Sequence, residues 1–134
     1  IGVTGVQTCA LPICTNSGLC ALAFSIHMSL LGEAGLRQLA AINHAKARQL
    51  AATLRTVPGI EILTPRYFNE FAIRVPGTAE ALVETLAAQN IIAGVPMTRL
   101  SPGGGMEDVL LLCATETTTD VDIDALASAL SKGH

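Results

Sequence analysis

The sequence predicts an α+β domain in which a small sheet carries helices on one face. Two observations support this class. Apolar residues recur every three to four positions between residues 16 and 57, as in helices, and after residue 60 they alternate or form short runs, as in strands. Half of the 134 residues are hydrophobic, which is enough for one compact core and too few for a second full domain.

Two helices are expected first. The first covers residues 16–31, with Asn16 or Ser17 suited to cap its start, and it ends at Gly32. Its apolar positions are Leu19, Leu22, Ala23, Ile26 and Leu30. The second helix, residues 35–57, keeps one apolar stripe and is stopped by the Pro-Gly pair that follows. Its stripe consists of Leu36, Leu39, Ala40, Ala47, Leu50, Leu54 and Val57.

Two strands, a helix, two strands and a last helix should follow. The expected strands are Ile60–Leu63, Phe71–Val75, Ile91–Val95 and Val109–Ala114. The last of these is almost wholly apolar, as in a central strand. Thr78 and Thr119 are expected to cap the two helices, and residues 96–108 are expected to form a loop.

Composition argues against two classes of partner. Only 14% of the residues are charged and the net charge is −3, so no basic patch for nucleic acid is expected. No apolar run approaches the roughly 20 residues of a membrane span, so no membrane contact and a cytoplasmic location are expected. The cysteines lack metal-ligand spacing and are expected to be free thiols. They are Cys9, Cys14, Cys20 and Cys113.

No side chain stands out as a catalyst or a metal ligand. His27 lies in an apolar helix, as a core or interface histidine does, and His44 is expected to be solvated. A covalent aldimine needs a lysine that can lose its proton, whereas Lys46 lies on a polar helix face and Lys132 in the terminal tail. The Gly-rich run at residues 102–105 precedes a strand, which favours a loop over a phosphate site.

Two short polar strings remain candidates for a site. Cys14, Thr15 and Asn16 stand at the entrance of the first helix, where they can cap it or reach a ligand across a domain boundary. The string Phe68-Asn69-Glu70-Phe71 opens a strand with two polar residues between aromatics, which turn and edge chemistry also explains.

Several ordered strings resemble one enzyme family. ICTNSGLCALAFSIHMSLLGEAGLRQLA, at residues 13–40, is similar to the start of the corresponding region in the alpha subunit of the glycine-cleavage P-protein, the glycine dehydrogenase (decarboxylating). The similarity continues through shorter strings to Glu116. These are residues 43–47, 58–63, 68–71, 94–96 and 112–116.

This resemblance implies the C-terminal small domain of a fold-type-I pyridoxal-phosphate enzyme. A beta subunit would supply the cofactor lysine, and together the subunits would decarboxylate glycine and pass the aminomethyl group to the lipoyl arm of H-protein. Cys14, Thr15 and Asn16 match the family string and would lie on the substrate or cofactor side. The chain is expected to be inactive alone and to have no catalytic residue of its own.

The resemblance also suggests an organisation for the chain. Residues 3–13, VTGVQTCALPI, resemble a translated sequencing adapter, so residues 1–13 are expected to be a foreign leader. Residues 14–34 would link to a missing large domain, and residues 35–134 would be the small domain. Two alternatives stay open. One is another fold-type-I enzyme, either an aminotransferase or a cysteine desulfurase, although neither Arg74 nor Arg99 stands in a carboxylate-binding string typical of those families. The other is a non-enzymatic, ferredoxin-like interaction domain.

Overall fold

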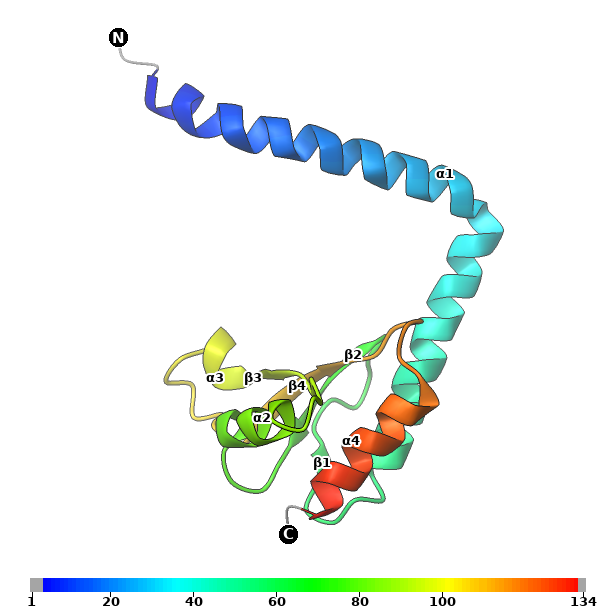
Figure 1. The fold of residues 1–134 in the computed structure, drawn as a ribbon, viewed down its shortest axis with the longest axis vertical. Helices are drawn as coiled ribbons and strands as arrows, with labels where there is room; N and C mark the ends of the chain where they lie inside the picture. The colour runs from blue at the N-terminus through cyan, green and yellow to red at the C-terminus, as the bar shows by residue number, and fades with distance from the viewer. Residues whose placement is uncertain (1–3, 133–134) are drawn as a thin grey trace. The chain divides into compact units, whose positions relative to one another are not determined.

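The computed structural model describes the backbone of residues 4–132 and the side chains of residues 17–132. The elements are α1 (Thr4–Leu54), β1 (Glu61–Ile62), β2 (Glu70–Arg74), α2 (Ala79–Ala87), β3 (Val95–Pro96), α3 (Met97–Leu100), β4 (Val109–Cys113) and α4 (Asp120–Lys132) (Figure 1). The chain divides between Gln38 and Leu39 into two compact units, and the whole sheet belongs to the second.

Helix α1 begins earlier than the sequence predicts. It starts at Thr4, so Asn16 and Ser17 lie inside the helix and the prediction that either caps its start is wrong. Once a helix has formed, each further residue is added at little cost, so these polar residues do not start a new one. The predicted break at Gly32 is confirmed, because its φ of 59° and ψ of −172° are not helical. Glycine adopts a positive φ without a steric penalty.

The end of α1 supplies part of the core of the second unit. The helix stops at Leu54, and Gly59 in the turn that follows has a φ of 79°. The C-terminal part of the predicted stripe, from Ala47 to Val57, is confirmed as buried, whereas Ala40 is exposed. The buried residues here are Ala47, Leu50, Ala51, Leu54 and Val57. Fully burying one leucine contributes about 1.5–3 kcal/mol to folding, so this end of the helix is firmly held.

The sheet has four antiparallel strands in the order β1-β2-β4-β3. Phe71 lies opposite Leu112 and Ile73 opposite Leu110, and all four side chains are buried on the same face. On the other face, Arg74 and Cys113 are exposed. The alternation predicted for the second strand and the central position predicted for the fourth are both confirmed.

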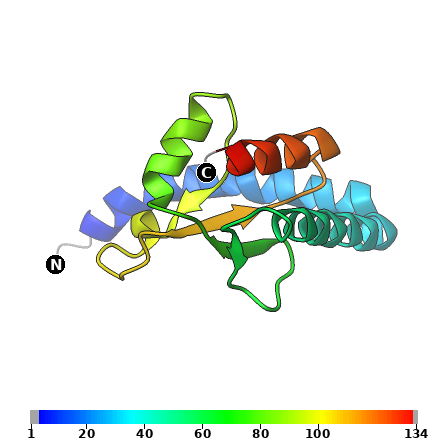
Figure 2. The same cartoon turned by 90° about the horizontal axis from the view of Figure 1, so that it is seen from below.

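Helices cover the buried face of this sheet. The end of α1, α2 and α4 all contribute to one apolar core with β2 and β4, and Figure 2 shows α2 and α4 on the same side of the sheet. The helices contribute Leu54, Leu86, Ile123, Leu126 and Leu130 to this core. The α+β class with helices on one face therefore holds for the second unit.

The third strand is shorter than predicted. It covers only Val95–Pro96, because Ile91 closes helix α2 and the chain joins the sheet only at Val95. Asn90 has a φ of 60°, and the backbone N–H of Ile91 donates to the carbonyl of Leu86 at 2.9 Å, which closes the helix end in a Schellman-type turn. The predicted loop at residues 96–108 also contains a short helix, α3, whose Thr98 hydroxyl donates to Glu80 of α2.

One helical stretch has the length and composition of a membrane span. Residues Ser17–Leu54 contain a window with a mean hydropathy of 1.5, although the sequence analysis expects no such stretch. The prediction differs because it rests on uninterrupted apolar runs, and Ser25, His27 and Ser29 interrupt the longest run. A core helix of a soluble protein passes the same test, so length and composition do not distinguish the two environments.

Candidate functional site

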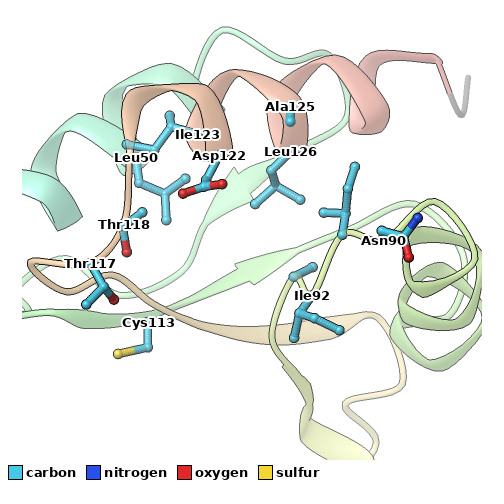
Figure 3. A pocket seen from close by; sticks show the side chains of 12 residues that line it. Leu50, Asn90, Ile92, Cys113, Thr117, Thr118, Asp122, Ile123, Ala125 and Leu126 are labelled. Atoms are coloured by element: carbon cyan, nitrogen blue, oxygen red, sulfur yellow. The ribbon is translucent and has the colours of Figure 1, made fainter.

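Two neighbouring cavities lie along β4 in the second unit. Their volumes are about 410 and 300 Å³, and they share Ile92, Ala93 and Cys113 in their linings. The larger lies between the loop after α2 and the start of α4, as Figure 3 shows. The smaller cavity is lined by Glu70, Val95 and the last three residues of β4, Leu111–Cys113.

The early end of β3 creates this opening. Val95 pairs with Leu111, so a longer strand would place Ala93 opposite Cys113. Ala93 and Cys113 do not pair. They line both cavities, because the chain before Val95 leaves the edge of β4 and Ile91 closes α2. Gly94 stands at the turning point, and a Cβ there would lie 2.2 Å from the carbonyl oxygen of Leu111. Only glycine allows the two backbones to approach so closely.

The larger cavity combines an apolar wall with one acidic side chain, Asp122. Leu50 and Leu126 form part of the wall, and the Asp122 carboxylate points from α4 into the cavity (Figure 3). Hydrogen bonds from the Thr119 hydroxyl (2.6 Å) and backbone N–H (2.8 Å) hold the pKa of Asp122 below its ordinary value. No lysine, arginine or histidine occurs among the described residues that line either cavity. The cavities therefore favour a neutral or cationic group over an anion.

Cys113 is a poor nucleophile in this setting. The Asn69 side-chain amide donates to its sulfur at 3.6 Å. Partial desolvation by the surrounding protein raises the pKa of the thiol, and the negative charge of Glu70, its partner on β2, raises it further. Because the thiolate is the reactive form, nothing here activates this cysteine for covalent catalysis.

The described residues do not fit pyridoxal phosphate. Lys46 pairs with Asp120 at 2.7 Å, and the exposed Lys132 lies at the last turn of α4, so neither faces a cavity. The cavity linings also lack a cation for the phosphate group.

Comparison with known proteins places the chain in a family. The family described as "Glycine cleavage system P-protein" matches residues 8–130. The chain belongs to this family. The match includes residues 8–13, the last part of the predicted foreign leader.

Curated relatives are similar over most of the chain. A probable glycine dehydrogenase (decarboxylating) subunit 1 of Caulobacter vibrioides is 69% identical over 90% of this chain, and its counterpart in Rhodospirillum centenum is 56% identical over 90%. This chain spans about a quarter of their length, 27% in both cases. The resemblance read from the strings is thereby confirmed.

One of the similar solved structures shares clear sequence identity with this chain, and two others share only its fold. A crystal structure of glycine decarboxylase (P-protein) in an inhibitor-bound form shares 34% identity with a TM-score of 0.72, over 80% of this chain and 24% of that chain. A NifS-like protein shares 14% identity with a TM-score of 0.58, and a C-DES mutant with a pyridoxal-phosphate cofactor shares 16% with a TM-score of 0.59. These two comparisons show a common fold and nothing more.

The side chains that the family string singles out cannot be placed. Cys14, Thr15 and Asn16 have helical backbone within α1, but their side chains lie outside the described residues. Their role on the substrate or cofactor side stays a prediction. His27 is exposed, so it is not buried within this chain.

The P-protein strings at residues 43–47 and 68–71 contact each other. The predicted solvation of His44 holds only in part. Its ring is partly buried, stacks on Phe68 at a centroid distance of 6.1 Å, and places Nδ1 2.9 Å from the Phe68 carbonyl oxygen. A carbonyl only accepts, so Nδ1 carries the proton. Sequence reasoning missed this pair because its partners lie on separate elements.

Neither arginine that the sequence offers, Arg74 or Arg99, lies in a cavity, and the Gly-rich run forms a loop. Arg74 donates from Nε to Asp108 at 3.0 Å and from a terminal nitrogen to Glu61, so its charge is already balanced. This arrangement disfavours Arg74 as a carboxylate-binding residue, and Arg99 is exposed at the end of α3. The Gly-rich run bends through positive φ angles at Gly103 and Gly105 and leads into β4, as expected for a loop.

Proposed function

We propose that this chain is the C-terminal small domain of subunit 1 of a glycine dehydrogenase (decarboxylating). The observation that carries the proposal is the 69% identity to the Caulobacter vibrioides relative over 90% of the chain. The 34% identical P-protein crystal structure supports the same placement within a fold-type-I enzyme. Because the chain spans 27% of the relative, the activity belongs to a longer protein.

The complete enzyme would decarboxylate glycine and transfer the aminomethyl group to the lipoyl arm of H-protein. Pyridoxal phosphate, bound through a lysine of the beta subunit, would supply the electron sink for loss of carbon dioxide. The name "subunit 1" of the relatives supports the existence of such a partner.

The alternative functions have weaker support. A NifS-like protein is 20% identical and an aminotransferase 18% identical, so these two structures share the fold without indicating a reaction. The balanced charge of Arg74 removes one candidate for binding a substrate carboxylate. A free-standing interaction domain would not account for a family match over residues 8–130.

A chimeric enzyme tests the proposal. The matched segment of the Caulobacter vibrioides subunit 1 is replaced by that of this chain, and the product is expressed with its cognate second subunit and H-protein. Exchange of labelled bicarbonate into glycine is expected at a rate close to that of the parent. The present chain alone and the second subunit alone serve as negative controls.

Two outcomes would count against the proposal. A soluble, assembled chimera without exchange above the second subunit alone would show that this chain cannot act as subunit 1. Exchange by the present chain alone would contradict the expectation that it is inactive in isolation. Size-exclusion chromatography separates the first result from a failure to assemble.

A further inference from the structure

The helical stretch 17–31 of α1 is apolar on several sides and carries no acidic or basic residue except His27. One side carries bulky aliphatic residues at helical spacing, and these are largely exposed. They are Leu19 (71% exposed), Leu22 (58%), Ile26 (52%) and Leu30 (81%). The next side, one position further along the chain, adds Cys20, Phe24, His27 and Leu31, of which Phe24 is 63% exposed and His27 is also exposed.

The third side is lined by small residues whose polar groups are already satisfied. Gly18, Ala21, Ser25 and Ser29 follow the same spacing. The Ser25 hydroxyl donates to the Ala21 carbonyl and the Ser29 hydroxyl to the Ser25 carbonyl, both at 2.8 Å. Serines bonded in this way present no unpaired hydroxyl proton to a neighbour, so this side can be buried at little cost.

Gly18 adds a second observation. Glycine in a helix interior costs about 1 kcal/mol relative to alanine. A Cβ at Gly18 would meet nothing within 4 Å in this structure, so no contact among the described residues requires the glycine. A neighbouring chain segment that approaches closely would explain it, as small residues allow backbones to come together.

We propose that the stretch 17–31 is enclosed on all three of these sides by the part of the subunit 1 polypeptide that this chain lacks. This inference rests on the proposed function, because the relatives are almost four times as long as the matched segment. A helix that is apolar all round belongs inside a protein or a membrane, and a single flat interface would cover one side only. The missing polypeptide is the occupant that is always present and large enough.

The single cysteine on this stretch provides the test. Cys20 is exposed here, so a maleimide should alkylate it quickly in this chain alone. In the complete chimeric subunit 1, without its second subunit, alkylation of Cys20 should be slower by about tenfold or more, because it then requires local opening. Peptide mass spectrometry separates Cys20 from the other cysteines, and the urea-denatured subunit gives the rate for full access.

A pair of leucine substitutions adds a second readout. Gly18→Leu should leave the helical circular dichroism of this chain unchanged or stronger, yet it should restore rapid Cys20 alkylation in the complete subunit or prevent its folding. Ala52→Leu adds a side chain at an exposed helical position outside the stretch and should leave Cys20 protected. Equal behaviour of the two variants would overturn the proposal.

Other occupants give different results. Fast alkylation of Cys20 in the complete subunit 1 that slows only when the second subunit is added would assign the stretch to a subunit interface and overturn the inference. Slow alkylation in this chain alone that is relieved by dilution would indicate a second copy. Protection by phosphatidylcholine vesicles, with none in the complete subunit, would indicate a membrane. Protection of Cys20 without bicarbonate exchange would uphold the inference while the proposed function fails.

Discussion

The Lys46 ammonium group and the Asp120 carboxylate form an ion pair of 2.7 Å that joins α1 to the first turn of α4. The side-chain amide of Gln49 donates to the same carboxylate oxygen at 2.9 Å. These hydrogen bonds, followed by the charge of Lys46, hold the pKa of Asp120 below its ordinary value. The contact fixes the start of the helix that forms one wall of the larger cavity.

This ion pair should make stability depend on acid pH. A carboxylate whose pKa is lower in the folded state stabilises the fold above its unfolded pKa of about 3.9, and the effect is lost as pH falls through the lowered value. Asp120→Asn should therefore lower the urea midpoint at pH 7, and the difference from the wild type should vanish in strong acid. The effect should be small because Asp120 is exposed.

Asp124→Asn is the control, since this exposed carboxylate lies on the same helix and no described residue pairs with it. It should change the midpoint less than Asp120→Asn at pH 7. A midpoint difference for Asp120→Asn that persists unchanged into strong acid would contradict the proposed linkage.

Thr119 and Thr78 occupy the same predicted position at two helices but differ in their contacts. The Thr119 hydroxyl donates to Asp122 and accepts from the Asp122 backbone N–H, whereas Thr78 makes no capping hydrogen bond with its side chain. Thr119→Ala should cost about 1 kcal/mol of unfolding free energy, and Thr78→Ala a few tenths at most. Urea denaturation measures both, and equal costs would refute the distinction.

Alanine substitutions at Gly94 and Gly77 distinguish the cost of a steric clash from the cost of backbone strain. Gly94→Ala should cost about 3 kcal/mol or more, because its Cβ would meet the Leu111 carbonyl oxygen and β4 would have to move. Gly77 has a φ of 75° but open space around it, so Gly77→Ala should cost only about 1 kcal/mol. Denaturant midpoints compare the two, and a Gly94 variant as stable as the Gly77 variant would show that β3 can shift freely.

Most elements of the second unit follow from local patterns in the sequence. The alternation at Phe71, Ile73 and Val75 places these three side chains on one face of the strand, whichever strand pairs with it. All three side chains are buried. Thr119 with Asp122 marks a helix start by the same local logic. Such signals need no knowledge of the tertiary fold, and those predictions are confirmed.

One of the two main errors has a local cause, and the other depends on a residue far away in the sequence. Ile91–Val95 has the composition of a strand, but Asn90 adopts a positive φ and commits Ile91 to closing α2. His44 has the spacing of a solvated side chain, but the loop at Phe68 folds over it. The cavities need both the turn at Asn90 and the pairing of β3 with β4, which joins residues far apart in the sequence, so the sequence alone could not locate them. The side chains of Cys14, Thr15 and Asn16 lie outside the described residues, so that part of the predicted site is untested.

The raised pKa of Cys113 predicts slow alkylation of this thiol near neutral pH. It also predicts that removing the negative charge of Glu70 changes the alkylation rate only modestly. Because partial desolvation is the main cause and the charge of Glu70 the second, Glu70→Gln should speed alkylation of Cys113 by roughly twofold, the effect of a surface charge interaction of about 0.5 kcal/mol. The pH profile of alkylation, followed on the Cys113 peptide, should shift slightly toward lower pH. Glu107→Gln, beyond the opposite end of β4, should leave the profile unchanged. A shift of equal size in both variants would mean that net charge, and not the cross-strand pair of Glu70 and Cys113, sets the reactivity of this thiol.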